Sequence, residues 1–137
     1  MKQMVSQKKF LKSEWNTHRA LLSYWILALF LLFIGCFIPI TEIIHNFFVI
    51  DTLLHLILYC ILSFIPMILL KSRKNAFLLS IAMTPIGYFF ETLHVMATGE
   101  TFSAINVLAN NAGVLAGIAT GFIVRLKRHY SPDESNE

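Results

Sequence analysis

Four long apolar runs constrain the fold of this chain more than any other feature. They cover Ala20–Ile40, Thr52–Leu70, Ala76–Met96 and Val107–Leu126. A helix needs about 20 apolar residues to cross roughly 30 Å of hydrocarbon, and each run meets that length. Helix is also the structure that pairs all backbone polar groups within one segment in lipid. The sequence therefore predicts an all-α membrane bundle of four transmembrane helices.

The basic residues predict the orientation of this bundle. All 11 lysines and arginines lie before the first run, between the second and third, or from Arg125 onward at the end of the fourth. The two remaining connections contain none. Because basic side chains stay on the cytoplasmic side during insertion, both termini are expected inside. Three segments follow: a basic interfacial segment at residues 1–19, a transmembrane domain at 20–126 and a polar cytoplasmic tail at 127–137.

The composition narrows the function classes. Hydrophobic residues make up 56% of the chain and charged residues 14%, which an ordinary soluble surface would not tolerate. The net charge of +3 is better explained by basic anchors facing anionic lipids than by nucleic-acid binding. Membrane lipids are therefore the expected partners, and nucleic acid is not.

Polar residues recur near the outer ends of three predicted spans. They are Asp51, His55 and Tyr59 on the second, Glu91 and His94 on the third, and Asn106 and Asn110 on the fourth. Spacings of three or four residues place each set on one helix face. Ionisable residues inside a membrane usually face the bundle interior or a water-filled cavity. We therefore expect one outward-facing polar pocket that holds a ligand.

Other interpretations of these residues stay open. Asp51 could cap its helix, and the histidines or asparagines could be interhelical hydrogen-bonding groups. Glu42, His45 and Glu100 are expected to be solvated loop residues. No cofactor is predicted, although a divalent metal on Asp51, His55, Glu91 and His94 is an alternative. No catalytic residue is assigned, and whether the chain is an enzyme is left undecided.

Small residues and prolines predict details of helix packing. Ala109, Gly113, Gly117 and Gly121 share one face of the fourth span and would let another helix approach closely. Packing inside the bundle is the favoured use of this face, with homo-oligomerisation as the alternative. Pro66 and Pro85 lie inside the second and third spans, where we expect bends.

Two sequence motifs resemble those of VanZ-like membrane proteins. Asp51-Thr-Leu-Leu-His55-Leu-Ile-Leu-Tyr59 is similar to the pattern D-K-x-x-H-F-x-x-Y, which opens a helix in that family. Glu91, Gly99, Ser103, Asn110 and Gly113 follow a second pattern of E-x-x-Q, G-R-x-F/A-S and D-x-x-x-N-x-x-G. The resemblance covers about residues 20–125.

Four positions depart from those patterns. The family has lysine, glutamine, arginine and aspartate where this chain has Thr52, His94, Glu100 and Asn106. The missing arginine matters most, because a loop arginine is a natural binder of phosphate or carboxylate. Either the site is retuned, with His94 supplying positive charge, or the fold is kept without the family's ligand.

The resemblance implies a bacterial cytoplasmic-membrane protein of the cell envelope, in a family associated with teicoplanin resistance and hence with antibiotic resistance. The favoured function is binding of a lipid or glycopeptide-like amphiphile in the outward pocket. One alternative is a small membrane enzyme acting on a lipid-linked headgroup, with or without a metal. A further alternative is a packing subunit of a membrane complex.

Overall fold

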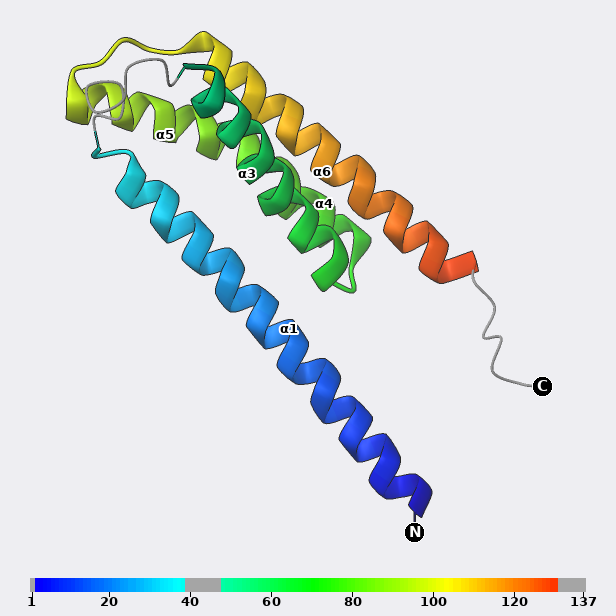
Figure 1. The fold of residues 1–137 in the computed structure, drawn as a ribbon. Coiled ribbons are helices and arrows are strands. Elements are labelled where there is room, and N and C mark those ends of the chain that lie inside the picture. The colour runs from blue at the N-terminus through cyan, green and yellow to red at the C-terminus, as the bar shows by residue number, and fades with distance from the viewer. Residues whose placement is uncertain (1, 39–47, 131–137) are drawn as a thin grey trace.

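The computed structural model describes residues 2–38 and 48–130, and every regular element within these ranges is helical. The elements are α1 (Lys2–Gly35), α3 (Phe48–Leu69), α4 (Arg73–Ile81), α5 (Met83–Thr98) and α6 (Ala104–Tyr130) (Figure 1). Four segments are long and apolar enough to cross a membrane: His18–Gly35, Ile50–Leu69, Arg73–Thr98 and Ala104–Tyr130. Within the described residues the predicted all-α fold is thereby confirmed, with four segments long and apolar enough to cross a membrane.

The third span is two helices rather than one. Helix α4 ends at Ile81, Ala82 forms a turn, and α5 begins at Met83. A proline clashes with the carbonyl four residues earlier, which for Pro85 is that of Ile81. The break therefore falls where Pro85 acts, and α5 leaves in a different direction from α4 (Figure 1). By contrast, α3 continues unbroken past Pro66.

Helices α3 and α6 form the centre of the bundle, and glycines bring them together. A Cβ atom added at Gly113 would overlap the Leu56 carbonyl oxygen, and one added at Gly117 would overlap that of Cys60. At Gly121 the clash would be with the side chain of Met67. The glycine face is thus used against α3 within this chain, with backbone meeting backbone at Gly113 and Gly117.

Helix α1 is attached to the bundle by a hydrogen bond to a carbonyl group that Pro66 leaves without its usual donor. A helical carbonyl normally accepts from the amide four residues later, but Pro66 has no N–H to offer Leu62. The Trp25 indole Nε1–H donates to that Leu62 carbonyl instead, at 2.8 Å. Trp25 and Leu32 also pack on the buried cluster that contains Leu62 and Tyr59. Helix α1 runs unbroken across residues 19 and 20, so the expected interfacial segment is continuous with the first span.

The fold separates charge between its two ends. The basic end contains the N-terminus of α1, the α3–α4 connection and the C-terminus of α6 (Figure 1). The polar end contains the N-terminus of α3, the C-terminus of α5 and the N-terminus of α6. No lysine or arginine lies between Arg19 and Lys71, or between Lys74 and Arg125. The polar end is therefore built from segments that carry carboxylates and imidazoles but no permanent cation.

Candidate functional site at the polar end

Asn106 joins α3 to α6 at the polar end. Its amide Nδ2 donates to Asp51 Oδ2 at 2.7 Å, and its Oδ1 accepts from the Thr52 hydroxyl at 3.0 Å. Both partners lie on the first two turns of α3, and Asn106 itself is only 7% exposed. The carboxylate can only accept, so it fixes which way the amide points. Asp51 is thus held by an interhelical bond, near the positive end of the α3 dipole.

His55 extends this network one turn deeper. Its Nδ1 lies 2.9 Å from Asn110 Oδ1, and its Nε2 lies 3.5 Å from Asp51 Oδ1. The side chains of Asp51 and His55 each remain 25% exposed. Asn110, in contrast, is 1% exposed, and its Nδ2 has no hydrogen-bond partner among the described residues. A buried donor of this kind is rare and calls for an acceptor such as a water or ligand atom.

Glu91 stabilises the connection between α5 and α6. Its Oε1 accepts from the Ser103 backbone N–H at 2.8 Å, although the residue is only 5% exposed. The Ser103 hydroxyl in turn accepts from the Asn106 N–H at 3.3 Å, as an N-cap does. Ser103 therefore connects the buried carboxylate on α5 to the Asn106 network on α6.

His94 lies in a separate array that joins α5 to the end of α1. Its Nδ1 is 3.0 Å from the Cys36 carbonyl oxygen, and its Nε2 is 3.0 Å from Glu100 Oε2. The carbonyl can only accept, so Nδ1 carries a proton. The contact between Nε2 and the carboxyl group needs a second proton. His94 therefore joins α5 both to the end of α1 and to the α5–α6 connection.

Tyr59 closes the inner end of the site. The residue is 1% exposed, and its ring lies parallel to that of His55 with centroids 6.4 Å apart. A Cβ atom added at Gly87 of α5 would come within 3.0 Å of the Tyr59 ring and 3.1 Å of Asn110 Nδ2. Gly87 therefore allows α5 to approach the point where Tyr59 and Asn110 meet.

The seven predicted pocket residues all lie at this end, but they do not converge on one point. Asp51, His55, Asn106 and Asn110 form one hydrogen-bonded array. Glu91 reaches it through Ser103, and Tyr59 through its contact with His55. The seventh residue, His94, is directed to Cys36 and Glu100 instead.

The four residues of the metal alternative are not gathered into one group in the described part of the chain. Within residues 2–38 and 48–130, no three His, Cys, Asp or Glu side chains are grouped as metal ligands would be. Asp51 and His55 adjoin one another, while Glu91 and His94 have the separate partners described above.

Of the three residues expected in solvated loops, Glu100 lies within the described part of the chain. Glu100 was expected to be a solvated loop residue, but it is half-buried and bonded to His94. Glu42 and His45 lie outside the described residues.

Sequence reasoning missed two members of the site, Thr52 and Ser103. A serine three residues before Asn106 at the start of an apolar run is a recognisable N-cap signal, so Ser103 could have been found. Thr52 carried no such signal, because its role depends on which residue of α6 lies opposite it.

Comparison of the chain with protein-family models, with curated proteins and with solved structures gave no match. The resemblance to VanZ-like proteins therefore remains an expectation.

Proposed function

We propose that this chain is a bacterial cytoplasmic-membrane protein of VanZ-like type that binds an amphiphilic envelope molecule at its polar end. The ligand class is a lipid or a glycopeptide-like amphiphile. The apolar part of such a ligand would lie in the surrounding lipid, against exposed side chains such as Leu53 and Leu54. Its polar part would meet Asp51 and His55.

One observation carries this proposal: the polar end holds carboxylates that are partly reachable and face no lysine or arginine. Asp51 is 25% exposed in its side chain, and the segments around it contain no permanent cation. Carboxylates and amide oxygens recognise donors, so the matching headgroup is rich in amine, amide or hydroxyl groups. The Nδ2 of Asn110, which has no hydrogen-bond partner among the described residues, adds N–H donors for an acceptor atom of the same ligand.

The four departures from the VanZ-like patterns support a retuned site rather than a lost one. They form two contacting pairs: Thr52 with Asn106, and His94 with Glu100. The family residues at the same positions are lysine with aspartate, and glutamine with arginine. Random loss would not be expected to alter both members of each contact. The first change replaces two oppositely charged residue types by neutral ones that hydrogen-bond here, and the second reverses the sign of the loop residue.

The geometry of His55 favours binding over catalysis. A general acid or base needs a nitrogen within reach of the substrate. Both ring nitrogens of His55 face protein oxygen atoms, those of Asn110 and Asp51. Both nitrogens of His94 are occupied in the same way. An enzyme acting on a lipid-linked headgroup remains the second candidate, because the Asp51–His55 pair is partly exposed.

The test compares Asp51→Asn with Glu14→Gln, which removes a carboxylate from α1 far from the polar end. Each protein is expressed in a bacterial host without a related gene, and teicoplanin susceptibility and membrane abundance are measured. Teicoplanin binding is also measured in nanodiscs. We expect the native chain and Glu14→Gln to bind and protect, and Asp51→Asn to do neither at equal abundance. Equal behaviour of all three proteins would refute the proposal.

The enzyme candidate makes a different prediction in the same strains. An enzyme would change the population of lipid-linked species in a lipid extract, and Asp51→Asn would abolish that change. Unchanged extracts together with Asp51-dependent teicoplanin binding would support the binding role. Elemental analysis of the purified protein tests whether a divalent metal is involved.

The orientation with both termini inside is part of this proposal. The basic end would then face the cytoplasm and the polar end the outside, as the distribution of lysine and arginine favours. Cysteine-labelling of Ser103→Cys and of His129→Cys with an impermeant reagent on intact cells tests it. The first position should be labelled and the second should not, in a background with Cys36 and Cys60 replaced by serine.

A further inference from the structure

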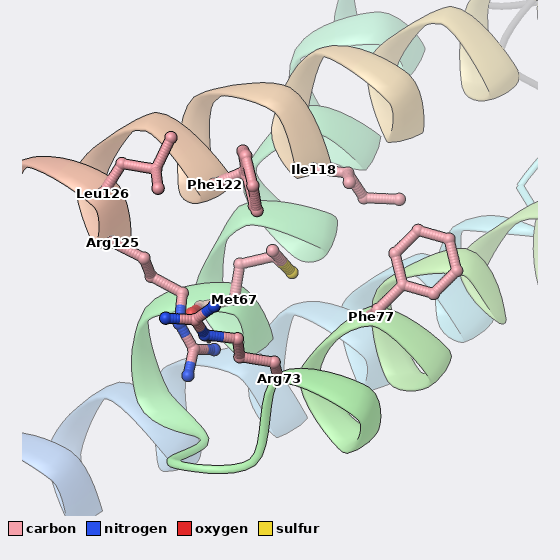
Figure 2. A pocket seen from close by; sticks show the side chains of 7 residues that line it. All are labelled: Met67, Arg73, Phe77, Ile118, Phe122, Arg125 and Leu126. Atoms are coloured by element: carbon pink, nitrogen blue, oxygen red, sulfur yellow. Dashed lines mark hydrogen bonds between the residues drawn. The ribbon is translucent and has the colours of Figure 1, made fainter. Parts of the chain in front are cut away.

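A pocket of about 300 Å³ opens at the basic end, opposite the candidate site (Figure 2). Its lining is apolar apart from two arginines, Arg73 at the start of α4 and Arg125 near the end of α6. The apolar residues are Met67, Phe77, Ile118, Phe122 and Leu126. Figure 2 shows the two guanidinium groups near one end of the pocket and the Phe77 ring at the other. This pocket therefore combines a cationic end with an apolar body.

Arg125 is fixed in place by the end of α3. Its Nη1 donates to the Met67 carbonyl at 2.9 Å, and its Nη2 donates to the Lys71 carbonyl at 2.7 Å. These bonds satisfy carbonyl groups left open where α3 ends. A guanidinium has five N–H donors, so three remain for another acceptor. Arg125 is thus preorganised, with donors to spare.

Arg73 supplies a second charge to the same pocket, and the three described helices that bound it place no acid beside it. The acidic residues on the helices that bound it, α3, α4 and α6, are limited to Asp51 at the opposite end of α3. The first turn of α4 also contains no acidic residue, so its positive dipole end is unopposed. Two guanidinium groups sharing one pocket repel each other unless an anion lies between them.

We infer that this pocket binds one anionic phospholipid of the membrane, with its phosphate between Arg73 and Arg125 and an acyl chain along Phe77, Ile118 and Phe122. The site is distinct from the polar end and does not depend on the function proposed there. It follows from charge complementarity in a chain whose helices span a membrane. A lipid supplies both halves of the match, an anion and a hydrocarbon chain, where a soluble anion supplies only the first.

The test measures lipids retained by the full chain. Protein is reconstituted with equal amounts of phosphatidylglycerol and phosphatidylcholine that have identical acyl chains, then released and examined by native mass spectrometry. We expect preferential retention of phosphatidylglycerol, strengthened about fivefold by each arginine. Arg73→Gln should therefore lower the preference about fivefold. Its matched control Lys74→Gln removes a charge from the next residue, outside the pocket, and should leave the preference unchanged.

Two further variants test whether a lost lipid preference comes from the charge at position 73, from the shape of the pocket or from unfolding of the protein. Arg73→Lys keeps the charge and should keep most of the preference, which would exclude unfolding as the cause of the loss. Ile118→Trp fills the apolar half, which lies beside Phe77 (Figure 2), without changing charge and should reduce retention of both lipids. Equal effects of Arg73→Gln and Lys74→Gln, equal retention of the two lipids by the native chain, or displacement of the lipid by inorganic phosphate would each overturn the inference.

Discussion

The Thr52 hydroxyl donates a hydrogen bond of 3.0 Å to Asn106 Oδ1 across the α3–α6 interface. The same Asn106 amide donates to Asp51 at 2.7 Å. The residue type at position 106 of α6 is therefore matched to the adjacent Asp51 and Thr52 of α3. A carboxylate at position 106 would face Asp51 with no donor. An amide at position 106 donates to Asp51 directly, so this contact needs neither a neighbouring cation nor a protonated carboxyl group.

Asn106→Asp should destabilise the protein, because the buried donor to Asp51 is replaced by a like charge. We expect a loss of about 1–3 kcal/mol in the free energy of unfolding. Adding Thr52→Lys should restore much of it by supplying the cation. Thermal unfolding in detergent measures both, with the exposed Asn75→Asp as control. If the double variant were no more stable than Asn106→Asp, the two positions would not be coupled.

Glu100→Arg should weaken the link between α5 and the α5–α6 connection. Arginine would replace the carboxyl group that His94 Nε2 now contacts at 3.0 Å, and a guanidinium cannot accept a hydrogen bond from the ring. Because the pair is partly exposed, the expected cost is about 1 kcal/mol. Changing His94→Gln in the same chain should recover stability, since glutamine is neutral and can accept from arginine. Differential scanning fluorimetry of the two single variants and the double variant measures the coupling, and additive effects would contradict it.

Trp25→Phe should cost about 1 kcal/mol of stability, because the Leu62 carbonyl loses the indole donor that replaces the N–H missing at Pro66. Pro66→Ala restores the ordinary helical donor to that carbonyl, so Trp25→Phe should cost less in a Pro66→Ala background. A double-mutant cycle of unfolding free energies measures this difference. Tyr24→Phe, at a neighbouring exposed position, serves as the control. An equal cost in both backgrounds would show that the indole acts only through packing.

Gly117→Ala should be destabilising, although alanine usually strengthens a helix. Its Cβ would overlap the Cys60 carbonyl of α3 and would force the two backbones apart, at a cost of about 1–3 kcal/mol. The matched control is Gly35→Ala in α1, where an added Cβ meets nothing within 4 Å. Equilibrium unfolding of both variants checks the contrast. A neutral Gly117→Ala would mean that α3 and α6 are less closely packed than the structure shows.

Hydrogen exchange tests the role of Glu91 in organising the polar end. The Ser103 amide bonds to Glu91 Oε1 at 2.8 Å and should exchange slowly in the native chain. Glu91→Ala should speed that exchange, whereas Glu91→Gln keeps an acceptor oxygen and should retain most of the protection. Amides in the middle of α6, such as that of Val114, provide the internal control. Unchanged exchange at Ser103 in Glu91→Ala would remove Glu91 from this structural role.

The sequence alone determined that the chain is helical and that it has four segments able to cross a membrane. Both properties follow from local quantities, the length of each apolar run and the need to pair backbone groups in lipid. The helix-face periodicity also brought Asp51 with His55 and Asn106 with Asn110 correctly to one end. These pairs share a helix, so no knowledge of helix packing was required.

Only the tertiary structure decided which helix each polar residue faces. His94 follows Glu91 by three residues, yet it bonds to the end of α1 and to Glu100 rather than joining the Asp51 network. The hydrogen bond from Trp25 to the carbonyl that Pro66 leaves open, and the pairing of Thr52 with Asn106, have the same origin. Each depends on the rotation and approach of two helices, which packing of side chains and glycine contacts sets. That information is not contained in the spacing of residues along either helix.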